Sequence, residues 1–168
     1  MVSDYRDWVF VAIGANQGDA RGNVGRVIER LKEFAKGPVL ASSLWQTSPV
    51  DCPPGSPTFI NAVVGFVPAT DQPEELLSHL QSIEAEFGRM RTGQVNAPRP
   101  LDLDIITFAG ETRSSPRLTL PHPRAHQRRF VLAPLAEIAP GLILSGRSET
   151  VRELLEHLPP GESVQKVA

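Results

Sequence analysis

The chain has 168 residues, of which 40% are hydrophobic and 21% charged, and its formal net charge is −2. This size and composition suit one globular domain over residues 1–168, and the small net charge argues against a general nucleic-acid binder. No apolar run approaches the ~20 residues of a membrane span, and the N-terminus carries acids where a signal peptide would be basic and apolar. Because Cys52 is the only cysteine, an internal disulfide is excluded and we expect a cytoplasmic protein.

The first half of the sequence predicts a strand, a helix and two further strands. Residues 8–13 form a short apolar run that ends in a turn-like segment, as in a buried strand. Apolar residues then recur at helical spacing over residues 24–34, and a Gly-Pro pair ends this helix. Residues 39–47 and 59–67 have strand character, and a loop rich in proline separates them.

The second half predicts another helix and another strand. Apolar residues at helical spacing between Leu76 and Phe87 mark the helix, and residues 103–108 form the strand. The order strand, helix, strand, strand, helix, strand is that of the ferredoxin-like α+β fold, with helices packed on one face of an antiparallel sheet. Residues 124–138 and 149–158 are expected to be C-terminal helical additions.

A basic stretch runs from Arg89 to Arg129. It contains eight arginines and no lysine, against three acids, which is a local balance of +5. A solvated basic face, with some arginines capping a helix C-terminus, would explain part of this pattern. However, arginine used in place of lysine favours bidentate contacts to phosphate or carboxylate, so we expect an anionic ligand here.

The strongest local signal is the pair Asp102 and Asp104. Side chains alternate along a strand, so these two acids share one face while Leu101, Leu103 and Ile105 take the core-facing side. Two neighbouring carboxylates repel each other unless a cation lies between them, and magnesium prefers one or two carboxylates together with water and phosphate oxygens. Two ordinary surface acids are the alternative, but the flanking arginines favour a magnesium site.

Two other segments carry weaker signals. Pro121 and Pro123 restrict the backbone around His122, although a lone histidine is more often structural than catalytic. Phe59 and Asn61 place an aromatic ring beside an amide, which suits a flat heterocycle, although core packing is the default explanation.

Taken together, four segments in order resemble one enzyme family over nearly the whole chain from Phe10 to Pro140. They are residues 12–19, residues 42–50 continuing to 59–62, residues 98–106, and residues 118–122 continuing to 128–132. The family is the bacterial hydroxymethyldihydropterin pyrophosphokinases of folate biosynthesis. The resemblance implies that diphosphate passes from ATP to the hydroxymethyl group of the reduced pterin, with release of AMP.

The resemblance also implies roles for individual residues. Two magnesium ions would lie between the ATP phosphates and the metal ligands Asp102 and Asp104, which would act in catalysis together with Arg89 and Arg99. The ATP site would be lined by Gln81, Glu84, Arg89, Arg91, Arg99, Ile105, Leu118, Thr119, His122 and Arg128. The pterin pocket would be formed by Thr47, Val50, Phe59, Asn61 and Phe130.

Three positions depart from common family members. Val95 stands where a basic residue is usual, Asn96 where some members have tryptophan, and Pro123 where some have tyrosine. Together these departures affect how the segment 90–98 is expected to close over the substrates, and they leave the reaction class unchanged. We expect a monomer that acts on ATP and the reduced pterin, with no nucleic-acid or membrane partner.

Two other classes compete with the enzyme. A ferredoxin-like sheet can bind RNA, but that needs exposed aromatic side chains on the central strands, where this sequence places acids. An inactive relative retained as an interaction subunit would be expected to lose the two aspartates or His122, and all three are present.

Overall fold

The structure is a computed structural model that describes residues 5–16, 18–47, 58–88, 101–161 and 163–167. Its centre is a sheet in the order β5-β1-β4-β3-β8, with β2 also paired to β4, and every pairing is antiparallel. The strands are β1 Val9–Ala15, β2 Leu40–Ala41, β3 Trp45–Thr47, β4 Phe59–Phe66, β5 Asp102–Phe108 and β8 Val164–Lys166. The expectation of a mixed α/β protein with an antiparallel sheet and helices is confirmed.

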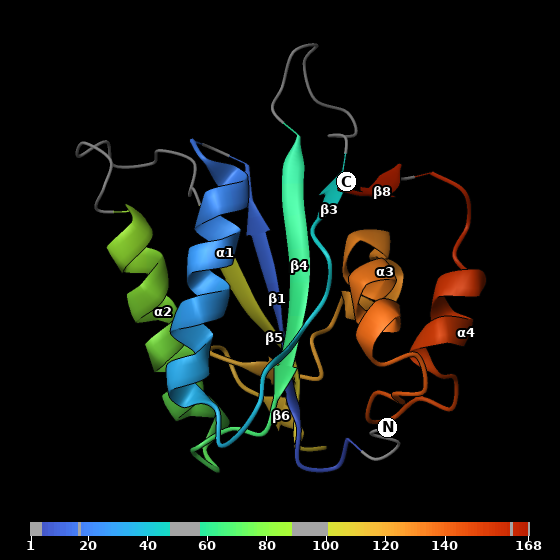
Figure 1. Ribbon diagram of the computed structural model, residues 1–168. Helices are drawn as coiled ribbons and strands as arrows, with labels where there is room; N and C mark the ends of the chain where they lie inside the picture. Colours follow the sequence, from blue (N-terminus) through green and yellow to red (C-terminus); the bar gives the residue numbers. More distant parts are fainter. Residues whose placement is uncertain (1–4, 17, 48–57, 89–100, 162, 168) are drawn as a thin grey trace.

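Two helices cover one face of the sheet (Figure 1). Helix α1, Ala20–Leu31, begins at Asp19, whose side chain accepts a hydrogen bond from the Gly22 backbone N–H at 3.1 Å. A short 3₁₀ turn, Lys32–Phe34, follows α1, and helix α2 covers Pro73–Gly88. The apolar stripes of both helices pack on alternate residues of the central strands, such as Val11 and Ile13 of β1, to form the larger core.

The other face carries helices α3, Arg129–Ile138, and α4, Val151–Glu156 (Figure 1). They lie inside the two C-terminal ranges for which helices were expected, and they bury the opposite side chains of the same strands, including Phe10, Val63 and Ile106. The helical spacing of these segments does not indicate which face they cover. The sheet therefore lies between two helical layers.

The strand expected over residues 39–47 is divided into β2 and β3. Ser42 lies between them, where its N–H donates to the Val63 carbonyl and its Oγ accepts from the Val63 N–H, both at 2.9 Å. The hydroxyl thus replaces a backbone partner, so the segment stays attached to β4 while it changes direction.

The outer parts of the chain are short elements. Strands β6, Arg113–Ser114, and β7, Thr119–Leu120, form a hairpin, and a 3₁₀ turn at Ala125–Gln127 leads into α3.

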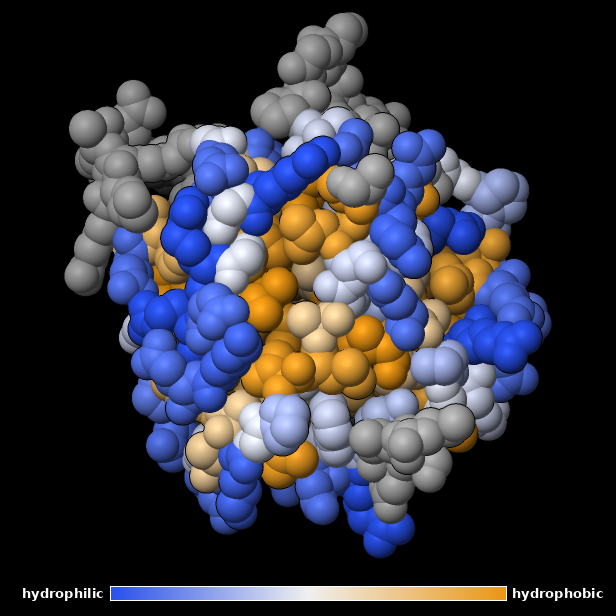
Figure 2. All heavy atoms as spheres, in the orientation of Figure 1, coloured by the Kyte–Doolittle hydropathy of each residue, from blue (hydrophilic) through white to orange (hydrophobic). Residues whose placement is uncertain are grey.

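Apolar residues gather in the middle of the face seen in Figure 2, between α1 and α3. Within the described ranges, only Leu40 and Ile143 are large apolar side chains classed as exposed. No helix there has the length and apolar character needed to cross a membrane.

Candidate functional site

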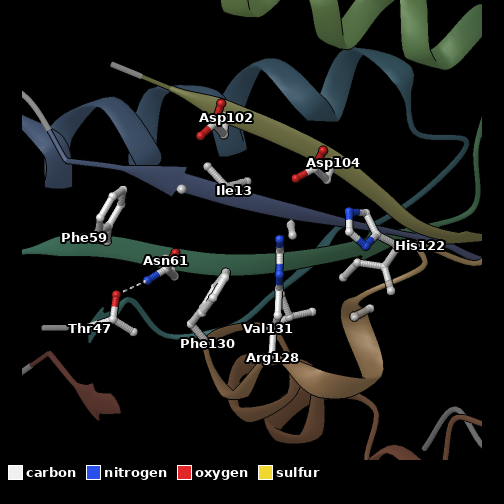
Figure 3. Close-up of a pocket in the computed structure, with 14 residues that line it drawn as sticks. Ile13, Thr47, Phe59, Asn61, Asp102, Asp104, His122, Arg128, Phe130 and Val131 are labelled. Atoms are coloured by element: carbon white, nitrogen blue, oxygen red, sulfur yellow. Dashed lines mark hydrogen bonds between the residues drawn. The ribbon is translucent and has the colours of Figure 1, made fainter. Parts of the chain in front are cut away.

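A cavity of about 310 Å³ lies between the sheet and the N-terminal end of α3. It joins residues that are far apart in the sequence, from β1, β3, β4, β5 and the segment that leads into α3 (Figure 3). Its walls are Ala12, Ile13, Gly14, Thr47, Phe59, Asn61, Asp102, Asp104, Ile106, His122, Ala125, Arg128, Phe130 and Val131.

The strand register explains how this cavity arises. Gly14 of β1 pairs with Asn61 of β4 on one side and with Asp102 of β5 on the other, and Ala12 pairs in the same way with Val63 and Asp104. Residues directly opposite one another in neighbouring strands project to the same face. Two small residues in the middle strand therefore form a floor between the acids of β5 and the amide of β4.

One end of the cavity is a buried polar pair. Asn61 and Thr47 are 5% and 7% exposed, and the Asn61 Nδ2 donates to the Thr47 Oγ1 at 3.0 Å (Figure 3). An asparagine amide offers both a donor and an acceptor, which is the pattern that reads an amide-like heterocycle edge. A Cβ atom on Gly14 would lie only 3.3 Å from the Asn61 Oδ1, so glycine keeps the space beside this acceptor open.

Aromatic side chains stand on both sides of this polar pair. Phe59 begins β4 and Phe130 lies in the first turn of α3, and both are half-buried and line the cavity. The Arg128 guanidinium lies over the Phe130 ring, 5.5 Å from its centroid. The arrangement offers flat apolar surfaces to a planar ligand and a cation at their edge.

The other end of the cavity is acidic. Asp102 and Asp104 are exposed and line the same cavity, while Leu103 and Ile105 between and after them are buried on the opposite face. The expected alternation is confirmed. Among the described residues no group of three or more histidine, cysteine or acidic side chains could hold a metal. Two carboxylates on one exposed strand edge nevertheless fit magnesium, which keeps several water ligands and shares phosphate oxygens with its substrate.

His122 lies near enough to Asp104, Arg124 and Arg128 for their charges to act on its ring. Its backbone N–H donates to the Ile106 carbonyl at 2.8 Å, and its Nδ1 accepts from the Arg124 N–H at 3.1 Å. Burial lowers the pKa of His122, and although Asp104 opposes this shift, Arg128 and Arg124 add to it. The ring is therefore neutral near pH 7, and because Nδ1 accepts, the proton is on Nε2, where it can be donated.

The cavity brings together a subset of the residues expected from the sequence. Its lining includes four of the expected pterin residues, both expected metal ligands and two of the expected ATP residues. They are Thr47, Phe59, Asn61, Phe130, Asp102, Asp104, His122 and Arg128.

The other described ATP candidates are not among the cavity's lining residues. Gln81 and Glu84 are on α2, and the Glu84 carboxylate accepts from the Leu103 N–H at 2.9 Å, beside the acidic strand. Thr119 is exposed on β7, whereas the side chains of Ile105 and Leu118 are buried in the larger core. Contact between a ligand and Ile105 or Leu118 would thus have to use their backbone atoms.

Four predicted site residues lie outside the described residues. They are Val50, Arg89, Arg91 and Arg99, and the segment 90–98 with Val95 and Asn96 lies outside as well. Their roles stay predictions.

The floor and the apolar backing of the cavity were not predicted from the sequence. Ala12 and Gly14 belong to the first family-like segment, but the smallness of two alternate residues in an apolar strand was the only local signal. Ile106, Ala125 and Val131 read as ordinary core residues and carried no such signal.

Comparisons with known proteins agree on one family. The sequence profile of the family described as 7,8-dihydro-6-hydroxymethylpterin-pyrophosphokinase (HPPK) matches residues 10–140. A Methylorubrum extorquens relative named 2-amino-4-hydroxy-6-hydroxymethyldihydropteridine pyrophosphokinase is 37% identical over 151 residues, which are 90% of this chain and 93% of the relative. A Synechocystis relative of the same name is 38% identical over 148 residues, or 88% and 74%.

Longer proteins also match. The folate synthesis bifunctional protein of Arabidopsis thaliana is 37% identical over 130 residues, which are 77% of this chain and 26% of that protein. A crystal structure of wild-type Plasmodium falciparum HPPK-DHPS with pteroate superposes with a TM-score of 0.67 at 14% identity, over 89% of this chain and 42% of that one. The chain therefore spans about a quarter of the first protein and less than half of the second. At this low identity, the structural match shows the fold alone.

Proposed function

The chain belongs to the 7,8-dihydro-6-hydroxymethylpterin-pyrophosphokinase family, and we propose that it transfers diphosphate from ATP to the hydroxymethyl group of 6-hydroxymethyl-7,8-dihydropterin. The products are AMP and the pterin diphosphate, an intermediate of folate biosynthesis. The observation that carries the proposal is a single cavity with an amide and two phenylalanines at one end and two aspartates at the other.

The amide end would hold the pterin. Its flat ring would lie against Phe59 and Phe130, and its amide-like edge would meet the Asn61 side chain, which the Thr47 hydroxyl orients. Val50 is assigned to the same pocket by the resemblance. This placement directs the hydroxymethyl group along the small-residue floor, toward the acidic end.

The acidic end would hold two magnesium ions through Asp102 and Asp104. Bound there, the metal would neutralise phosphate charge and orient the diphosphate that is transferred. The chain's own contribution is to keep both carboxylates on one exposed face of β5, which sets their separation before any ligand arrives.

The ATP polyphosphate would lie between these acids and the cations. His122 would donate a hydrogen bond from Nε2, and Arg128 would supply a positive charge at the cavity wall. Arg89, Arg91 and Arg99 would stabilise the charge that shifts between oxygens during transfer, and Arg89 and Arg99 are therefore assigned to catalysis. The rest of the proposed ATP site consists of Gln81, Glu84, Ile105, Leu118 and Thr119.

Several broader assignments belong to the same proposal. The strand order β5-β1-β4-β3 supports classification of residues 9–108 as ferredoxin-like, with α3 and α4 as C-terminal additions. We propose one pyrophosphokinase domain over residues 1–168, which acts as a cytoplasmic monomer without a nucleic-acid or membrane partner.

The deciding experiment is a coupled assay for AMP. Purified protein with ATP, magnesium and the reduced hydroxymethylpterin should release AMP and form the pterin diphosphate in equal amounts. A reduced pterin with a methyl group in place of the hydroxymethyl group is the matched control, because it lacks the attacking oxygen. AMP release that is the same with both pterins, or absent with both, would refute the proposal.

A further inference from the structure

Glu137 lies in the last turn of α3, and its carboxylate accepts hydrogen bonds from donors in β3 and in the segment just before it. It accepts from the Ser43 N–H at 3.0 Å, from the Ser43 hydroxyl at 2.6 Å and from the Trp45 Nε1 at 3.0 Å. The side chain of Glu137 retains 26% of its exposure. Three charge-assisted hydrogen bonds from two neighbouring residues hold a carboxylate in one orientation.

A third element joins the same group. Lys166 of β8 places its Nζ 3.7 Å from the Glu137 carboxylate and 5.5 Å from the centroid of the Trp45 ring. Strand β8 pairs with β3 in a register that sets Trp45 opposite Lys166 and Thr47 opposite Val164. Glu137 therefore connects α3, β3 and the C-terminal strand.

Two of the three elements that Glu137 connects, β3 and α3, carry cavity residues. Thr47 is two residues beyond Trp45 on β3, so both side chains project to the same face of the sheet. Phe130 is about two helical turns before Glu137 on α3. Phe130 and Thr47 both line the cavity, and Thr47 in turn holds the Asn61 amide (Figure 3).

The short length of β3 makes this connection important. The strand has only three residues, and its backbone ladders to β4 and β8 fix its position within the sheet. Those ladders do not set its distance from the helix that lies across the sheet's face. The bonds from Ser43 and Trp45 to Glu137 connect the strand to that helix directly.

We propose that Glu137 is a positioning residue for the pterin pocket, which fixes the spacing between Thr47 with its Asn61 partner on one side and Phe130 on the other. The inference rests on the proposed function, because it takes the pterin to bind in this cavity. Glu137 touches no substrate in this scheme and acts through the residues that do.

The test compares Glu137→Ala and Glu137→Gln with wild type. Pterin affinity and ATP affinity are measured separately by calorimetry, and the KM for each substrate and kcat by the AMP assay. Since a misplacement of about 1 Å can cost roughly 100-fold, we expect Glu137→Ala to weaken pterin binding roughly 10-fold or more. ATP affinity should change less than about two-fold, and Glu137→Gln, which keeps one oxygen acceptor, should lie between Glu137→Ala and wild type.

Two further variants keep the proposal testable if Glu137→Ala does not fold. Trp45→Phe removes one donor to the carboxylate but keeps an aromatic ring. Like Glu137→Gln, it should therefore weaken pterin binding. Glu156→Gln on α4 removes an exposed carboxylate that pairs with Arg152 of the same helix, and it should change neither affinity.

The outcomes separate this inference from the proposed function. Wild-type protein that binds no pterin would contradict the proposed function itself. Wild-type pterin binding that is unchanged in Glu137→Gln and Trp45→Phe would overturn the positioning role. Equal losses for pterin and ATP in those two variants would also overturn it, because they would indicate general damage to the fold.

Discussion

The two ends of the cavity handle polar groups in opposite ways. Thr47 and Asn61 are buried and bonded to each other, so their orientation is set before a ligand binds. Asp102 and Asp104 stand exposed on the edge strand. Burial of two neighbouring carboxylates would be costly unless cations were present, whereas a neutral amide and hydroxyl can satisfy each other inside the protein.

This difference shows that one cavity can combine two kinds of site. Its polar pair is already oriented before a ligand binds, whereas its two carboxylates need a bound cation to balance their charge. Gly14 and Ala12 separate the two ends by the width of a single strand. Their small side chains leave room for a ligand to span from the amide to the acids. We expect mutations at the acidic end to affect turnover most, and mutations at the amide end to affect selective pterin binding.

The largest effect is expected at the acidic end. Asp102→Ala and Asp104→Ala should each lower magnesium-dependent turnover by roughly two or more orders of magnitude, the size found when one preorganised electrostatic group is removed. Thermal unfolding should change little, because both side chains are exposed and neither supports a core. The measurements are the AMP assay across a magnesium titration and the melting temperature.

An aspartate elsewhere provides the matched control for this first prediction. Asp71 is exposed before the start of α2, and Asp71→Ala should retain full turnover. Activity near wild type in both β5 variants would mean that the acidic end is an ordinary charged surface.

The next effect should appear at the amide end. Asn61→Ala leaves the polar edge of the pterin without its partner, and we expect a loss on the order of 1–3 kcal/mol in pterin binding. Thr47→Val keeps the side chain's shape but removes the hydroxyl that orients Asn61, so its loss should be smaller. Calorimetry with each substrate alone separates the effects. If ATP binding weakens as much as pterin binding, the two ends of the cavity are not independent.

Local patterns in the sequence predicted the acidic end of the cavity well. The acids at residues 102 and 104 alternate with apolar neighbours, and period-two alternation is a property of a single strand. The burial of Leu103 and Ile105 confirms the assignment of faces. The same pattern also places the Ile105 side chain in the core, which limits its predicted role in the ATP site to its backbone.

The floor, the amide end and the packing of α3 depend on contacts between segments that are distant in the sequence. Gly14 becomes part of a floor only because β1 pairs with Asn61 and Asp102 in a particular register, and no local pattern specifies that register. Glu137 resembles any acid of an amphipathic helix until α3 packs against β3. Helical spacing likewise could not indicate that α3 and α4 cover the opposite face of the sheet.

A smaller effect should come from the floor between the two ends. The Cβ of Gly14→Ala would lie 3.3 Å from the Asn61 Oδ1, closer than an ordinary van der Waals contact. The amide must shift by a few tenths of an ångström, so we expect a loss in pterin binding near the low end of the ~1–3 kcal/mol typical of overpacking. In the same calorimetric comparison, the affinity for ATP should not change. A pterin affinity equal to that of wild type would mean that the floor has room for an additional methyl group at this position.

The smallest effect is on folding stability and concerns Glu137, a third carboxylate, which sharpens the comparison because protein donors satisfy it. Burial alone would raise its pKa, but the hydrogen bonds from Ser43 and Trp45, aided by Lys166, outweigh burial and lower the pKa below its ordinary 4.5. The unfolded chain therefore takes up this proton first as the pH falls. The stability that the charge contributes is complete above about pH 4.5 and is lost as the pH falls through the lowered value.

We expect the free energy of unfolding of wild type to exceed that of Glu137→Gln by under about 1 kcal/mol at pH 7, given the group's partial exposure. Urea unfolding from pH 7 to pH 3 should show this difference shrinking at the acid end. A difference that stays constant over the whole range would mean that the charge of Glu137 contributes nothing and that only its shape does.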